Sequence, residues 1–242
     1  SEVTSIQTQD QSLTYFDHVN QVEKIMSYDK LILAMGSRQQ SNILENWSHP
    51  QIVTTKELQN AANGFALLDK VQHIAVVGGG QIGIEVTEAL VNANKQVTLI
   101  EAGDSLMSRY FDKDFVDSIQ EAIEMVGVDI HLSEKVIDIS GSPIEIKTNL
   151  RTFQPDAVIL GVNLTPQSQM VADDLALNDD GTISVNEYLE TSEKNIFAIG
   201  DLVQTPSFND TSAFIALVNN AVRSGQIAAF NLFEQRIKHQ RS

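Results

Sequence analysis

Three consecutive glycines at 78–80 follow a short apolar run in the segment HIAVVGGGQIGIEV, and a fourth glycine stands at position 83. Glycine weakens strands and helices, so such a cluster marks backbone that turns sharply or lies close to another group. Gly78, Gly80 and Gly83 fit the pattern Gly-x-Gly-x-x-Gly between a predicted strand and a predicted helix. In that context Gly78 permits the tight turn, Gly80 lets the backbone approach a pyrophosphate, and Gly83 lets the helix pack closely on the strand.

The start of that helix would direct unpaired amides and the positive end of its dipole at the phosphates, so Gly79, Gln81 and Ile82 belong to the same candidate site. Glu101 ends the next predicted strand, 18 residues after Gly83. A carboxylate there accepts hydrogen bonds from a ribose 2′-hydroxyl and repels a 2′-phosphate, which selects NAD over NADP. The competing interpretation is a glycine-rich turn between a strand and a helix, with a glutamate on the surface.

Composition and charge exclude several classes of function. The 242 residues carry 16 Lys and Arg against 32 Asp and Glu, a formal net charge of -16, which argues against nucleic acid and anionic membranes as partners. The chain has no cysteine, so it has neither disulfides nor thiolate metal sites. The five histidines lack ligand spacing, and we assign no metal site and no catalytic side chain. With no membrane-spanning stretch or signal pattern, we expect a cytoplasmic protein that binds small-molecule nucleotides.

The glycine turn opens a region in which strands and helices alternate. The expected order is strand 73–78, helix 81–95, strand 96–102, helix 111–127 and strand 128–133, followed by a hairpin around Gly141 and a buried strand at 156–161. A parallel neighbour requires a crossover helix, so this order predicts an α/β fold with a parallel sheet.

The flanking regions follow other patterns. Before the glycine turn, the sequence predicts a three-stranded antiparallel meander over 3–28 with turns at Asp10-Gln11 and Asn20-Gln21. A strand buried on both faces at 31–34, a polar linker at 41–55 and a helix at 56–70 follow. After the alternating region, it predicts a turn at Asp180-Gly181, a buried strand at 195–201 and a helix over 212–234.

Several of these segments together resemble the flavin-dependent pyridine nucleotide-disulfide reductase superfamily, and its NADH oxidase and NADH peroxidase branch in particular. The resemblance covers essentially the whole chain and rests on YDKLILAMGS, GGGQIGIE, VTLIEAGDSLMSRYFDKDF, GVNLTP, TSEKNIFAIGD and IALVNNAVRSGQIAAFNL, in that order.

The resemblance implies roles for residues around an NAD(H) site. Gly78, Gly80 and Gly83 would hold the pyrophosphate and Glu101 the adenosine ribose. The other implied residues are Tyr110 beside the adenine, Glu85 near the nicotinamide amide and Gly161 lining the nicotinamide pocket. Each of these three also has a plain alternative: a packing tyrosine, an exposed helix carboxylate and a strand terminator.

The resemblance also implies parts of a flavin site. Gly200 and Asp201 match a motif that contacts the ribityl chain, and Met35 and Gly36 match a turn at a domain junction. Leu217, Val218 and Asn219 would start a helix aimed at the flavin pyrimidine edge. The chain departs from the family at Met35, where threonine is usual, at Val218 and Asn219, where Ala-Thr is usual, and at Gln81, where members often carry a ring.

Family members carry an earlier glycine fingerprint and a redox cysteine before the region matched here, and a dimer-interface domain after it. The resemblance therefore implies that residues 1–42 and 163–242 are two parts of an FAD-binding domain, with an NAD(H)-binding Rossmann-like domain inserted at 43–162. We expect this piece to hold a complete NAD(H) site and an incomplete FAD site that does not retain FAD, and to be inactive alone. The intact protein would be a homodimer.

The implied activity is hydride transfer from NADH to FAD and then to O2, peroxide or a disulfide, with NADH oxidase favoured. The alternative from another functional class is a non-catalytic NAD(H)-binding sensor or scaffold module.

Overall fold

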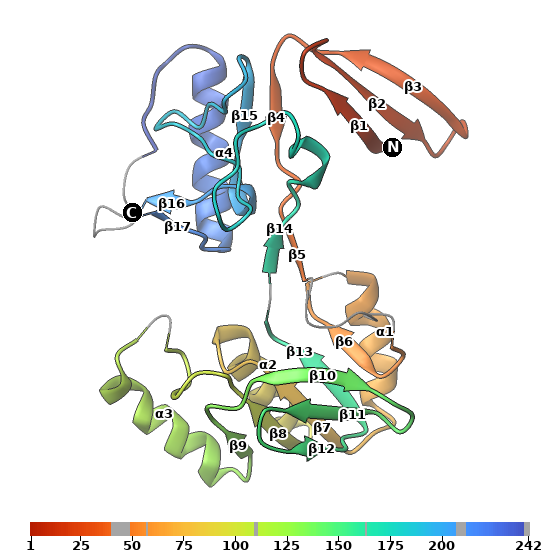
Figure 1. The fold of residues 1–242 in the computed structure, drawn as a ribbon, viewed down its shortest axis with the longest axis vertical. Helices are drawn as coiled ribbons and strands as arrows, with labels where there is room; N and C mark the ends of the chain where they lie inside the picture. The colour runs from red at the N-terminus through yellow and green to blue at the C-terminus, as the bar shows by residue number, and fades with distance from the viewer. Residues whose placement is uncertain (40–48, 57, 109–110, 163, 207–211, 240–242) are drawn as a thin grey trace. The chain divides into compact units, whose positions relative to one another are not determined.

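The computed structural model describes residues 1–39, 49–56, 58–108, 111–162, 164–206 and 212–239. The chain divides into two compact units. Unit 1 comprises Ser1–Arg38 and Leu164–Ser242, and unit 2 comprises Gln39–Asn163. The chain therefore leaves unit 1 once, forms unit 2 and returns (Figure 1).

Unit 2 is built on a five-stranded parallel sheet with the order β6-β13-β7-β8-β9. Its strands are β6 (Ile52–Thr54), β7 (His73–Val77), β8 (Gln96–Ile100), β9 (Asp129–His131) and β13 (Ala157–Leu160). Three helices are part of the same unit: α1 (Leu58–Leu68), α2 (Gln81–Asn92) and α3 (Lys113–Met125). The predicted α/β fold with a parallel sheet is confirmed.

Both faces of this sheet are covered. Ile74 and Val76 of β7 pack in a core with residues of the three helices, whereas Ala75 and Val77 pack in a second core. The second core is completed by a three-stranded antiparallel sheet of β10 (Val136–Ser140), β11 (Glu145–Thr148) and β12 (Thr152–Phe153), as Figure 1 shows. Alternate side chains of a strand point to opposite faces, so β7 is buried on both sides.

Unit 1 contains smaller sheets around one core. The predicted meander is confirmed as β1 (Glu2–Gln7), β2 (Ser12–Asp17) and β3 (Val22–Ser27). The remaining elements are β4 (Leu31–Leu33) parallel to β15 (Ile196–Ala198), β5 (Ser37–Gln39) beside β14 (Leu164–Pro166), β16 (Thr205–Pro206) beside β17 (Ser212–Ala213), the short 3-10 helices η1 (Gln169–Val171) and η2 (Gly200–Leu202), and α4 (Val218–Leu232).

Three expectations about local structure are wrong. The helix predicted from Ser212 begins at Val218, because Ser212 and Ala213 pair with β16 instead. The segment expected to be a linker contains β6, which pairs with β13, although residues 40–48 lie outside the described part of the chain. The strand expected to be buried on both faces at 31–34 is β4, in which only Leu33 is fully buried.

Candidate functional site

The turn after β7 needs glycine at its first position for two reasons. Gly78 has a φ of +105°, which L side chains rarely adopt, and a Cβ there would collide with the side chain of Val162. Its N–H donates to the carbonyl oxygen of Ile100 at 2.7 Å, which ties the turn to the end of β8. The backbone is thereby fixed at the point where the chain leaves the sheet.

Gly83 and Gly161 let three elements meet beside that turn. A Cβ on Gly83 would overlap the carbonyl oxygen of Gly78, so the first turn of α2 packs directly on the turn backbone. A Cβ on Gly161, just after β13, would lie 3.2 Å from both N and Cα of Gly83. The structure thus brings Gly161 to the glycine motif, and close packing accounts for glycine at both positions.

Gly80 differs, because nothing in the described chain demands glycine there. Its φ of -80° and ψ of -172° suit any residue, and a Cβ would meet no atom within 4 Å. Gly80 is the N-cap of α2, it provides no side-chain cap, and no acidic residue stands in the first turn. The first N–H groups of a helix have no partner within it, so this helix end offers donors beside open space.

The Glu101 carboxylate is held beside the turn by two backbone groups. Its Oε2 accepts a hydrogen bond from the Gly79 N–H at 2.6 Å, and its Oε1 accepts one from the Gly103 N–H at 2.6 Å. Glu101 follows β8, the strand next to β7 in the sheet. The predicted acid therefore lies against the glycine turn with a fixed orientation, and the Gly79 N–H is directed at this carboxylate.

The loop after Glu101 supplies contacts that the glycine motif does not predict. Leu106 is fully buried, and its Cδ2 would lie 2.5 Å from a Cβ on Gly79. The Met107 N–H donates to the Gly79 carbonyl oxygen at 2.9 Å. The only local signal was an apolar Leu-Met pair inside a polar loop, and its partner could not be read from the sequence.

The remaining residues predicted for the nucleotide lie in less constrained positions. Gln81 and Glu85 are exposed on α2, where the Gln81 amide donates to Glu85 Oε1 at 3.4 Å. Ile82 is half-buried. Tyr110, expected beside the adenine, lies outside the described residues.

In unit 1 the residues expected near a flavin gather at the ends of two paired strands. Gly36 follows β4 with a φ of +69°, and Gly200 follows β15 with a φ of +64°. The Ser37 hydroxyl donates to Asp201 Oδ2 at 2.8 Å, which joins the two turns. The carbonyl oxygen of Met35 accepts from the side chain of Gln167 at 2.6 Å.

The start of α4 lies close to the second of these turns. The Gly200 N–H donates to the Ser224 hydroxyl at 2.9 Å, and a Cβ on Gly200 would lie 3.4 Å from that of Ala221. Leu217 is the extended N-cap, without a side-chain cap, and the exposed residues Val218 and Asn219 follow it. Unit 1 therefore brings most of the residues expected near a flavin to one region.

The described residues form neither a metal site nor a membrane span. Within these ranges, no group of three or more His, Asp or Glu side chains is arranged to hold a metal ion. No helix there combines the length and apolar character that a membrane span needs.

Comparisons with known proteins agree with this geometry. The family model described as pyridine nucleotide-disulphide oxidoreductase matches residues 1–225. An NADH oxidase of Enterococcus faecalis is 32% identical over 242 residues, covering 98% of this chain and 54% of that protein.

Two solved structures share the fold closely. A water-forming NADH oxidase from Lactobacillus brevis, bound to NADH, is 29% identical with a TM-score of 0.92. A water-forming NADPH oxidase engineered from it, bound to NADPH, is 28% identical with the same TM-score. Each alignment covers 98% of this chain and 54% of the other, so the chain spans about half the length of these relatives.

The match over residues 1–225, the parallel sheet with its glycine turn, and the NADH oxidase relatives confirm the resemblance seen in the sequence. This chain belongs to the pyridine nucleotide-disulphide oxidoreductase family.

Proposed function

We propose that unit 2 binds NAD(H) and that the chain forms the NAD(H)-binding core of a flavoprotein NADH oxidase. The observation that carries the proposal is Gly80, a glycine with an ordinary backbone conformation and empty space beside it. Gly78, Gly83 and Gly161 are explained by the chain's own packing, but Gly80 is not. Close approach of a ligand explains it, and the uncapped end of α2 suits a pyrophosphate.

Glu101 supports a dinucleotide rather than a free phosphate as the ligand. Its carboxylate lies next to the same turn, held by the Gly79 and Gly103 amides at 2.6 Å each. A carboxylate in this position accepts hydrogen bonds from the ribose hydroxyls and repels a 2′-phosphate, so the preferred ligand is NADH.

The two water-forming oxidase structures support a choice of nucleotide that depends on side chains and not on the fold. One is described with NADH and the other, an engineered variant, with NADPH, yet each has a TM-score of 0.92 to this chain. The engineered variant carries five substitutions, which supports selection of the nucleotide by few side chains on an unchanged fold, and Glu101 is our candidate in this chain.

Unit 1 would supply part of a flavin site. Gly36, Gly200 and Asp201 would let the flavin pass close to the backbone, and the first turn of α4 would direct its amides at the flavin ring. When both cofactors are bound, they supply hydride transfer from the nicotinamide to the flavin. The chain's own groups orient the two rings and hold their polar edges.

The fit to FAD is partial. A flavin dinucleotide needs its own helix N-terminus for its pyrophosphate, and the one Gly-x-Gly-x-x-Gly among residues 1–242 lies in unit 2. We therefore propose that residues 1–242 by themselves bind NADH, release FAD and do not turn over. A visible spectrum of the purified chain tests this, and flavin absorption in this 242-residue species would contradict it.

Calorimetric titration with NADH tests the nucleotide site itself. Gly80→Ser puts a hydroxyl at the N-cap of α2, where it accepts a hydrogen bond from the helix and occupies the phosphate space. We expect NADH affinity to fall at least about tenfold, because a lost hydrogen bond to a charged group is worth about 1.5–3 kcal/mol. The melting temperature should not fall.

The matched control is Asp112→Ser at the N-cap of α3, in the same unit. It should leave NADH affinity unchanged. Wild-type protein that takes up no NADH, or a Gly80→Ser variant that binds NADH as well as wild type, would overturn the proposal.

A further inference from the structure

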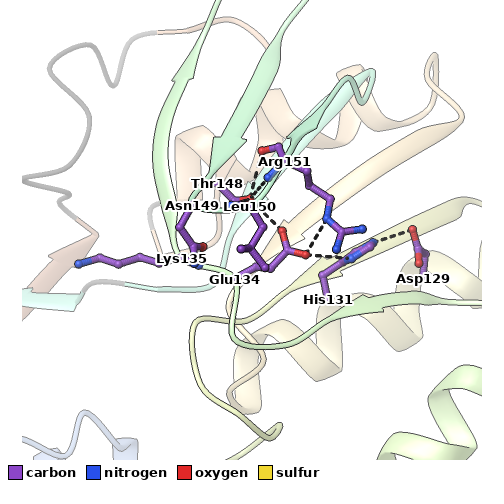
Figure 2. A network of polar contacts seen from close by, with 8 residues as sticks. All are labelled: Asp129, His131, Glu134, Lys135, Thr148, Asn149, Leu150 and Arg151. Carbon is purple, nitrogen blue, oxygen red and sulfur yellow. Dashed lines mark hydrogen bonds and ion pairs between the residues drawn. The ribbon is translucent and has the colours of Figure 1, made fainter.

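A buried acid outside the nucleotide site connects the predicted ribose carboxylate to the rest of unit 2. The Glu134 side chain, three residues after β9, is only 2% exposed. Its Oε1 accepts from Arg151 Nε at 2.8 Å, and its Oε2 accepts from the Thr148 hydroxyl at 2.8 Å (Figure 2). A buried carboxylate is costly unless it is paired, so these contacts fix its position relative to the turn between β11 and β12.

Further contacts hold the same segment, both within itself and to this turn. His131 Nδ1 lies 3.3 Å from Glu134 Oε1, and its Nε2 lies 2.9 Å from Asp129 Oδ2, as Figure 2 shows. The Lys135 N–H donates to Asn149 Oδ1 at 2.8 Å, and the Asn149 N–H donates to the Lys135 carbonyl oxygen at 3.1 Å. Residues 131–135 are therefore held along their length.

The backbone of this segment also holds Glu101. The Glu101 N–H donates to the His131 carbonyl oxygen at 2.9 Å, and the Glu134 N–H donates to the Glu101 carbonyl oxygen at 2.9 Å. The Ser133 N–H donates to the Gly103 carbonyl oxygen at 2.7 Å. Gly103 is also one of the two residues whose amides bind the Glu101 carboxylate. The position of Glu101 thus depends on a segment that Glu134 anchors.

We propose that Glu134 is a positioning residue for nucleotide selection: through the backbone of 131–134 it fixes the Glu101 carboxylate where it accepts a ribose hydroxyl and repels a 2′-phosphate. The proposal rests on the NAD(H) site proposed above. Without the Glu134 anchor, residues 101–103 gain freedom and the carboxylate can turn away from the 2′ position. Removal of the Glu134 side chain should therefore lower the preference for NADH over NADPH and not only the stability of the chain.

The test measures binding of NADH and NADPH by calorimetry in the 242-residue chain, together with its melting temperature. Glu134→Ala should lower the preference for NADH by roughly three- to tenfold, within the range of coupling between contacting residues. Arg151→Met, which removes the half-exposed ion-pair partner of Glu134, should also lower the preference for NADH. Arg151→Lys, which keeps the positive charge, should retain most of that preference. The matched control is Ile144→Ala, which removes buried packing next to β11 without touching the polar network. It should lower the melting temperature and leave the preference unchanged.

The decisive comparison uses Glu101→Ala as a background. Because Glu134 acts through Glu101, adding Glu134→Ala to Glu101→Ala should change the preference no further. A full additional loss in the double variant, or an equal loss in Ile144→Ala, would overturn the inference. Wild-type protein without any preference for NADH would instead overturn the proposed function, so the two failures are distinguishable.

Discussion

Units 1 and 2 differ in how they support the turns that carry the candidate site residues. In unit 2 all four residues of β13 are buried, and the sheet is packed on both faces. In unit 1 all six residues of β3 are exposed, and the described sheets have two or three strands around one core. A sheet covered on both faces holds its strand ends in place, and in unit 2 the Glu101 and Leu106 side chains add to this support at the turn after β7.

The glycines of the two units reflect the same difference. Gly36 and Gly200 in unit 1 have φ values of +69° and +64°, so the backbone conformation itself favours glycine. Gly80 in unit 2 has an unstrained φ of -80°, and the described chain gives no reason for glycine there. Glycine of the first kind is explained by the bend of the backbone, whereas glycine of the second kind is explained, in our proposal, by the close approach of a ligand.

The largest expected effect comes from Gly83→Ala in α2. The new Cβ would overlap the carbonyl oxygen of Gly78, so α2 must move away from the sheet and unit 2 should lose more than about 3 kcal/mol. Gly225→Ala in α4 is the matched control, because its nearest contact is an ordinary 3.7 Å and Ala favours a helix by about 0.5–1 kcal/mol. Urea unfolding checks both, and equal stabilities would refute the close packing of α2.

Gly36→Ser and Gly80→Ser separate the two kinds of glycine. A Cβ at either position meets nothing within 4 Å, so the difference is purely conformational. Gly36→Ser should cost about 1–2 kcal/mol of unfolding free energy because of its left-handed backbone. Gly80→Ser should cost none. Hydrogen exchange read separately in the two units checks the assignment, and equal costs would break the comparison.

The smallest effect concerns acid stability. The Lys24 ammonium and the Asn20 amide beside Asp17 hold the pKa of that carboxyl well below its usual range in unit 1. In unit 2 the His73 and Gln72 amides lower the pKa of Asp156, to a lesser degree. A lowered folded-state pKa contributes stability that is present above the ordinary value near 3.8 and is lost as pH falls toward the folded value.

Exchange rates measured between pH 7 and pH 3 should therefore show that the meander of unit 1 loses more stability than the start of β7 in unit 2. Asp17→Asn should weaken the meander at pH 7, and its difference from wild type should shrink as the pH falls below 4. A difference that is independent of pH would mean that the ion pair with Lys24 contributes nothing.

The sequence predicted the elements with strong local patterns and missed those decided at a distance. The strand, turn and helix around Gly78, Gly80 and Gly83 follow from spacing alone, and so does the meander. β6 was missed because three residues in a polar segment become a strand only beside β13. The start of α4 was misplaced because Ser212 and Ala213 become a strand only beside β16.

The candidate site shows the same limit. Glu101 could be found by its spacing from the glycines, but its two amide partners and the buried Leu106 depend on how the loop folds back. Glu134 carries no signal at all, because its partners Thr148 and Arg151 come from a hairpin well after it in the chain. Roles for Glu85, Tyr110 and Gly161 stay predictions.

The hydrogen bonds of the Gln39 side chain bear on how unit 2 is connected to unit 1. Gln39, its first residue, donates through Nε2 to the carbonyl oxygen of Leu160 at 2.5 Å, and its Oε1 accepts from the Thr55 N–H at 2.9 Å. The two points at which the polypeptide passes between the units thus adjoin, and β5, which ends at Gln39, also pairs with β14. Because the two ends of unit 2 adjoin, we expect that unit 2 can be deleted and the two parts of unit 1 joined by a short linker. Each unit could then be expressed separately.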